Sequence, residues 1–240
     1  LLDKPFQIPI GTGTNHTISI VDADGTRGSL TLDQAVGMVG LTGGNVRTTV
    51  DDGTIMLQGE RLRFFSLVVN DSRPDGSFAF EATGGDGRLG ISDIVVKESI
   101  GRIDAACVDL EGRLTTGAVK RIELGNVSQS HITIGASGDL NDRVSILFQR
   151  VRDVTLQSEL PIASITATDW LDTDQSADVI QAPRLAALKI TGDVRAEVPG
   201  NFQANLTLSD NTNQPTLGDV TITGQIGPGI WNVVGDVRRI

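Results

Sequence analysis

The sequence predicts an all-β fold and, within that class, a parallel β-helix or β-solenoid whose coils are irregular in length. Three features support this: the composition, the spacing of short apolar segments, and a small motif that recurs along the chain. The 240 residues include 22 Val, 21 Ile and 23 Thr, which favour strands, and 28 Gly with 23 Asp, which favour tight turns. The hydrophobic content of 39% is sufficient for a sizeable core.

Short strands are expected along the whole chain, because apolar residues alternate over brief segments that Gly, Asp, Asn or Pro interrupt. Helical periodicity is weak, since the two best candidates, residues 32–39 and 177–188, contain Gly37 and Pro183. The expected strands are residues 17–20, 54–57, 62–69, 77–80, 132–134, 144–148, 154–156, 206–208 and 220–222.

A motif recurs from about residue 85: an apolar residue, two spacers, an apolar residue, one spacer, and a small or apolar residue. Its constant direction and phase favour coils stacked in parallel over the hairpins of a β-sandwich. Its uneven spacing predicts unequal coils with protruding turns. The copies are Ile100/Ile103/Ala105, Val119/Ile122/Leu124, Val151/Val154/Leu156, Ile162/Ile165/Ala167 and Leu185/Leu188/Ile190, with Val237/Ile240 beginning another.

Turns are expected at a second recurrence, in which Gly-Asp precedes an apolar residue, because Gly permits a positive-φ corner and Asp can bond the backbone. The copies begin at Gly138, Gly192, Gly218 and Gly235.

Residues 1–84 differ from the rest, since they hold five of the seven Phe and carry paired-strand signals at residues 21–25 and 50–53. An open solenoid exposes unpaired backbone groups at its end. We therefore expect residues 1–84 to form an N-terminal β cap or the first broad coils, and residues 85–240 to form the solenoid repeat region.

Composition also restricts the partners and sites to be expected. The net charge of −10 argues against nucleic acid and anionic membranes, and the apolar stretches are too short for a transmembrane helix. One Cys and two His are too few for a disulfide framework or a Cys/His zinc site. The chain starts at Leu1 without Met and stops within a strand-like pattern, so we expect a piece of a longer polypeptide.

Six segments carry a resemblance to a known class of proteins: residues 100–105, 132–135, 162–174, 177–183, 188–193 and 201–209. Taken together, they resemble the β-strand-repeat regions of very large secreted or surface-attached bacterial proteins. This resemblance covers roughly residues 85–240. It implies a β-solenoid module within a long extracellular polypeptide, and it brings no catalytic motif with it.

The densest group of acidic residues is Asp169, Asp172, Asp174 and Asp178, in a loop between strands. Four carboxylates so close together could hold Ca²⁺, a hard cation that prefers oxygen ligands. Asp172 and Asp174 could alternatively cleave a glycosidic bond. The simplest interpretation is a solvated corner whose aspartates cap turns. We interpret the neighbouring Trp170 as a plug over the solenoid end or side rather than a sugar-stacking platform.

The function that these features favour is a non-enzymatic structural or adhesive solenoid module of a bacterial extracellular protein, secreted or on the cell surface. Two alternatives remain open: a carbohydrate-active β-helix enzyme, either lyase or hydrolase, and a calcium-stabilised binding module. The expected partners are neighbouring domains of the same polypeptide and a glycan or another cell-surface ligand. No cofactor other than calcium is expected.

Overall fold

The computed structural model describes residues 4–11, 15–22, 24–139, 141–174, 176–209 and 214–240. Every regular element in this part of the chain is a strand, which confirms the all-β prediction. It holds no helix with the length and hydropathy that a membrane span needs. The strands are β1 (Lys4–Ile10), β2 (Thr17–Asp22), β3 (Arg27–Asp51), β4 (Thr54–Thr83), β5 (Leu89–Val96), β6 (Ile100–Ala105), β7 (Val108–Thr116), β8 (Val119–Leu124), β9 (Val127–Ile134), β10 (Val144–Leu147), β11 (Arg150–Ser158), β12 (Ile162–Ala167), β13 (Asp169–Leu171), β14 (Val179–Ala182), β15 (Leu185–Ile190), β16 (Asn205–Ser209), β17 (Leu217–Ile222), β18 (Trp231–Val234) and β19 (Val237–Arg239).

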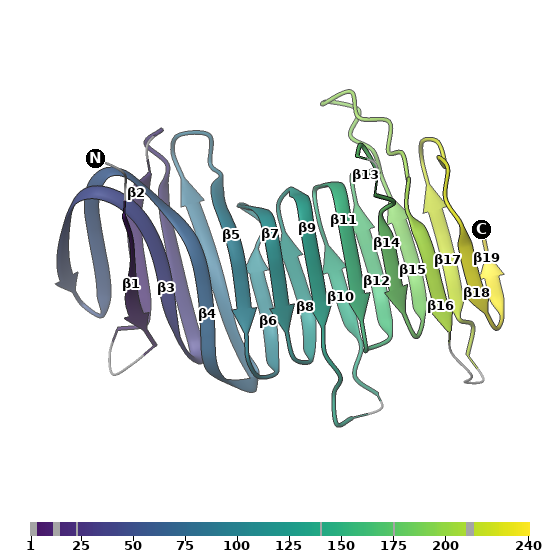
Figure 1. Ribbon diagram of the computed structural model, residues 1–240, viewed down its shortest axis with the longest axis horizontal. Coiled ribbons are helices and arrows are strands. Elements are labelled where there is room, and N and C mark those ends of the chain that lie inside the picture. Colours follow the sequence, from purple (N-terminus) through teal and green to yellow (C-terminus); the bar gives the residue numbers. More distant parts are fainter. Residues whose placement is uncertain (1–3, 12–14, 23, 140, 175, 210–213) are drawn as a thin grey trace.

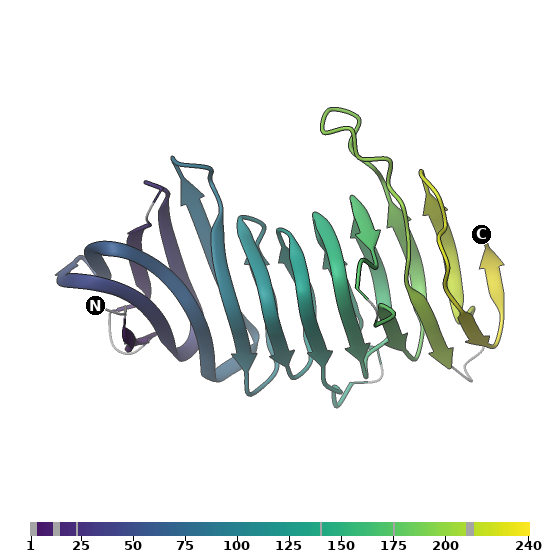
Figure 2. The same cartoon turned by 45° about the horizontal axis from the view of Figure 1, so that its top comes forward.

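Coils stack in parallel along one axis, which confirms the β-solenoid (Figure 1). On the first face, each strand pairs in register with the equivalent strand of the next coil. The order along this face is β6, β8, β10, β12, β15, β17 and β19. Figure 2 shows the same stack from another side.

The other two faces come from strands that bend in the middle. In β7 the register shifts between Glu111 and Arg113, where Gly112 has a φ of 142°. Gln129 of β9 and Asp153 of β11 have φ values of 46° and 57° at the equivalent corner. The halves before this corner form the second face, which β13 continues, and the halves after it form the third face, which β14, β16 and β18 continue.

The core consists of columns of aliphatic side chains, one from each coil. On the first face Ile103, Ile122, Ile146, Ile165 and Leu188 are aligned by the strand register, and all are buried. Burial of such a column removes apolar surface from water in every coil, which is the main favourable contribution to folding.

One copy of the recurring motif lies in a different column from the others. Val151, Val154 and Leu156 belong to β11 on the second and third faces, whereas β10 supplies this coil of the first face. The two-spacer interval does not distinguish the two places, because in β11 it spans the left-handed corner at Asp153 and still leaves Val151 and Val154 buried.

The Gly-Asp recurrence does not always mark a corner. Gly192 and Gly235 have positive φ values of 62° and 124°, as expected for corners. Gly218, by contrast, lies inside β17. A Cβ at Gly218 would stand 1.9 Å from the carbonyl oxygen of Ala186, so this glycine allows two backbones to approach closely.

We expect Gly218→Ala to lower the free energy of unfolding by about 1–3 kcal/mol, because the added methyl group meets rigid backbone. The matched control is Gly90→Ala in β5, where an added Cβ would meet nothing within 4 Å and φ is not positive. It should change stability by no more than about 0.5 kcal/mol. Urea denaturation measures both, and equal effects would contradict this account.

Residues 4–83 extend the stack with antiparallel pairs. β3 and β4 form a long curved hairpin whose tip, Asp51–Thr54, has positive φ at Asp52 and Gly53, as an Asp-Gly hairpin turn requires. The hairpin curls round at one end of the stack (Figure 2). β2 pairs with both of its strands, while β1 pairs with β3. β4 then pairs in parallel with β5 and β6, which attaches the hairpin to the coils. The domain boundary at residue 84 stays a prediction.

Candidate functional site

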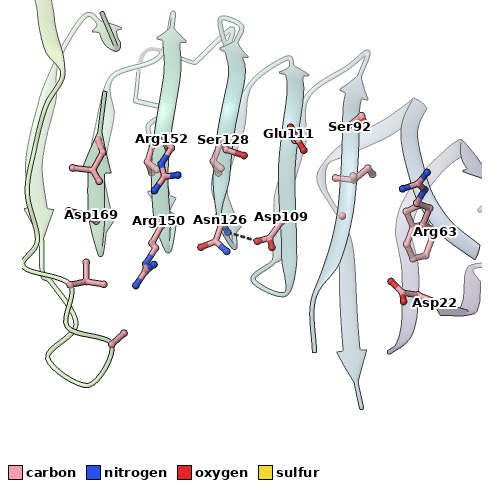
Figure 3. A pocket seen from close by; sticks show the side chains of 18 of the residues that line it. Asp22, Arg63, Ser92, Asp109, Glu111, Asn126, Ser128, Arg150, Arg152 and Asp169 are labelled. Carbon is pink, nitrogen blue, oxygen red and sulfur yellow. Dashed lines mark hydrogen bonds between the residues drawn. The ribbon is translucent and has the colours of Figure 1, made fainter. Parts of the chain in front are cut away.

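A groove of about 1120 Å³ runs across the second face of the solenoid. Its floor comes from β5, β7, β9, β11 and β13, which lie side by side (Figure 3). The β3–β4 hairpin bounds one end and residues 196–199 bound the other. Because stacked strands are about 4.8 Å apart, this floor extends roughly 19 Å along the axis. The groove is therefore shaped for an extended molecule rather than a small one.

The floor consists of two rows of side chains that follow the axis. In each coil a buried apolar residue lies between two residues that line the groove, because successive side chains of a strand point to opposite faces. One row holds Gly90, Asp109, Asn126, Arg150 and Asp169, and the other holds Ser92, Glu111, Ser128, Arg152 and Leu171.

Two carboxylates of the floor already have partners within the protein. Asp109 forms an ion pair with Arg88 and accepts a hydrogen bond from the backbone N–H of Asn126 at 2.8 Å. Asp169 is 7% exposed and accepts a hydrogen bond from the backbone N–H of Asn201 at 2.7 Å. These two groups hold the floor and the adjoining loop in place.

Two cationic side chains in the groove have no such partner. Arg150 and Arg152 are exposed, lie on the same face of β11, and make no hydrogen bond or ion pair with any residue that the structure describes. At the hairpin end, Arg63 Nε donates to Thr42 Oγ1 at 3.2 Å, and Phe65 is 44% exposed. The groove thus offers guanidinium groups and an aromatic surface to a ligand.

The predicted metal ligands divide into two groups in the structure. Carboxylate oxygens of Asp172 and Asp174 lie within 4.8 Å of each other and of Asp153, which the sequence pattern did not single out. Asp169 lies at the floor of the groove. Asp178 is 2% exposed and faces the core, where it bonds protein donors. The structure brings Asp172 and Asp174 together but places Asp169 and Asp178 outside this cluster.

Asp153 holds the loop of residues 172–174 against the corner of β11. Its carboxylate accepts hydrogen bonds from the backbone N–H groups of Thr173, at 2.6 Å, and Asp174, at 3.1 Å, and from the Thr173 hydroxyl. Partial burial opposes ionisation of Asp153, but these donors outweigh it and lower the pKa of the carboxyl below its usual value. One oxygen of Asp172, Oδ1, is buried without a hydrogen-bond partner in the described part of the chain.

Asp178 and Trp170 form a buried polar pair inside the coil. Asp178 Oδ2 accepts a hydrogen bond from Trp170 Nε1 at 2.7 Å, and Oδ1 accepts one from the backbone N–H of Val154 at 2.8 Å. Trp170 is fully buried between Phe148 and Phe202, so it lies inside the solenoid and does not plug its end or side. Burial raises the pKa of Asp178 to about 7.

Calcium binding remains a prediction that a melting experiment can test. If Asp172 and Asp174 bind Ca²⁺, about 1 mM Ca²⁺ should raise the melting temperature of the wild type relative to chelator, because a ligand that binds the folded state stabilises it. The Asp172→Asn/Asp174→Asn double variant should show no such difference. An unchanged melting temperature in the wild type would contradict the calcium hypothesis.

Comparisons with protein-family models, with curated proteins and with solved structures found no match to this chain. The function of the chain has to be inferred from its own geometry and chemistry.

Proposed function

We propose that this chain is a non-enzymatic structural and adhesive β-solenoid module of a larger bacterial extracellular protein, secreted or on the cell surface. The observation that supports this most is the continuous parallel pairing from β4 to β19. Each coil bonds the coils on either side through the backbone and adds to one aliphatic core, so the stack resists bending. Such a module can hold neighbouring domains of its polypeptide apart and present a side surface for contact.

The acidic surface chemistry supports the same proposal. With a net charge of −10, the chain favours neither nucleic acid nor anionic membranes as partners. The groove on the second face offers a polar surface of a kind that can contact a glycan or another cell-surface ligand.

The alternative is a carbohydrate-active enzyme that uses Asp172 and Asp174. Catalytic carboxylates must face the bond that is cleaved. In the described part of the chain, neither residue lines the groove, and both belong to the corner loop that Asp153 holds. Their position supports a turn-forming role over a catalytic one.

An activity assay separates these proposals. We expect the wild type to release neither reducing ends nor unsaturated products from acidic or neutral polysaccharides. Turnover that the Asp172→Asn/Asp174→Asn double variant lacks would overturn the non-enzymatic proposal.

Stiffness can be measured on single molecules. Val50→Cys in β3 and Val237→Cys in β19 would be introduced in a Cys107→Ser background and labelled with dyes. Both positions are exposed, and the two strands lie towards opposite ends of the stack (Figure 1). We expect one narrow distribution of energy transfer that mild denaturant does not broaden before global unfolding. A broad distribution under native conditions would contradict a rigid spacer.

A further inference from the structure

We propose that the groove on the second face binds a linear oligosaccharide that contains uronate residues, lying along the solenoid axis with a carboxylate on Arg150 and Arg152. This inference rests on the adhesive part of the proposed function and names the ligand class and the site. Four observations carry it: the extended shape of the groove, the paired backbone of its floor, its exposed arginine pair and the exposed aromatic ring at one end.

The floor recognises ligands through side chains, because its backbone groups are already used. β7 pairs with β5 and β9, and β9 pairs with β7 and β11, so no strand in the middle of the floor has a free edge. A peptide that binds as an added β-strand needs such an edge. The floor instead presents amide, hydroxyl and carboxylate groups, which suit the many hydroxyl groups of a sugar chain.

Arg150 and Arg152 supply the site for an anionic group. They are two residues apart on one strand, so both side chains point to the same face and lie close together. A guanidinium can donate two parallel hydrogen bonds to a carboxylate, and charge-assisted bonds of this kind are stronger than neutral ones. The positive charge of Arg152 helps to lower the pKa of the neighbouring Asp153 carboxyl, which already accepts hydrogen bonds from the backbone N–H groups of Thr173 and Asp174.

On one side of the arginine pair lies Asp169, whose carboxylate accepts a hydrogen bond from the backbone N–H of Asn201. The residues on the other side suit the uncharged part of a sugar chain. In the preceding coil, where β9 begins, Asn126 and Ser128 are half-buried and line the groove directly alongside Arg150 and Arg152. One coil further, Glu111 is exposed and can accept hydrogen bonds from sugar hydroxyl groups.

The opposite end of the groove offers a different kind of contact. Phe65 can stack on the apolar face of a sugar ring, and Arg63 lies beside it. Because the floor extends roughly 19 Å between the two ends, an oligomer fills it and a monosaccharide does not.

The negative charge of the protein restricts the binding of an anionic sugar chain to the arginine pair. The net charge of −10 and carboxylates of the groove lining, among them Asp22, Glu111 and Glu197, repel a polyanion, so affinity depends on the arginine pair and falls as salt screens it. A neutral sugar chain of the same length lacks the carboxylate and should bind much more weakly.

Isothermal titration calorimetry tests the proposal with defined oligosaccharides: hexamers of galacturonate and of mannuronate, a hyaluronan hexasaccharide, and cellohexaose as the neutral control. We expect the wild type to bind at least one uronate probe, and to bind it about tenfold or more tightly than cellohexaose. The Arg150→Ala/Arg152→Ala double variant should lose that preference. Arg143→Ala, which removes an arginine outside the groove, should bind as the wild type does.

Each contrary outcome contradicts a different part of the proposal. If no uronate probe binds, the inference fails, while the structural role remains open to the stiffness and activity tests. If the double variant binds as tightly as the wild type, the groove site fails but glycan adhesion stands. If a glycerol-phosphate polymer, titrated in the same way, binds more tightly than every uronate probe, the uronate assignment is overturned. Cleavage of a bound probe overturns the non-enzymatic proposal and leaves the groove as the substrate site.

Discussion

Replacing Trp170 by alanine should lower the free energy of unfolding by about 3–5 kcal/mol, the cost of removing a fully buried aromatic side chain. The Trp170 ring packs between those of Phe148 and Phe202, with centroids 6.4 and 6.1 Å away, so neighbouring coils cannot close the cavity. The substitution also removes the indole N–H that bonds Asp178 and so leaves a buried carboxyl oxygen without its donor. Two losses at one place make this one of the most damaging single substitutions in the chain.

Two further variants separate these losses. Trp170→Phe keeps most of the ring but removes the N–H, so it reports chiefly on the hydrogen bond to Asp178. Trp231→Ala removes the other Trp, which packs against Phe202 but is only partly buried, and should cost less. Urea denaturation followed by circular dichroism measures all three variants. Equal stability of Trp170→Ala and Trp231→Ala would contradict the account of a closed aromatic column.

The parallel stack could be predicted from the sequence because each coil repeats its own inward residues. Ile103, Ile122 and Ile165 recur in phase, and the structure places them in one column. The column of Val151 could not be assigned in the same way, since its motif also fits a bent strand. A linear pattern records alternation along a strand but not which face of a coil the strand occupies.

The groove could not be predicted because its signal runs across coils rather than along one segment. The triplets Asp109-Leu110-Glu111, Asn126-Val127-Ser128 and Arg150-Val151-Arg152 each place a buried apolar residue between two polar ones. Alignment of these triplets coil by coil would have revealed the two rows. That alignment needs the register, which the unequal loops between coils hide.

The acidic cluster was only partly predictable for a similar reason. Asp172 and Asp174 are close in sequence, but Asp153 joins them from the preceding coil, where it occupies the corner of β11. Sequence proximity likewise grouped Asp178 with the loop, although its side chain faces the core. A short count of residues cannot tell which side of the chain a carboxylate points to.

Raising the pH from about 5 to about 8 should destabilise the wild type through Asp178. Burial is the main cause that raises the pKa of this carboxyl from 3.8 to about 7, and the charges of Asp172 and Asp153 add to it, while the hydrogen bonds from Trp170 and Val154 oppose it. A carboxyl whose folded-state pKa is raised contributes stability that is fully present below its unfolded-state pKa. That stability is lost as the pH rises through the folded-state pKa, because the folded protein then carries a buried charge.

Asp178→Asn should remove this pH dependence and lower stability at acidic pH. The amide is neutral at all these pH values. Its NH₂ group, however, faces one of the two N–H groups that donate to the carboxyl oxygens of Asp178, and the loss of that hydrogen bond lowers the free energy of unfolding by about 1–3 kcal/mol. The difference between variant and wild type should therefore be largest near pH 5 and shrink towards pH 8. Asp174→Asn, which removes one exposed carboxylate from the same loop, is the control in melting-temperature scans. If Asp178→Asn and the wild type lost stability equally over this range, Asp178 would not be the group that titrates, since the amide has no proton to lose.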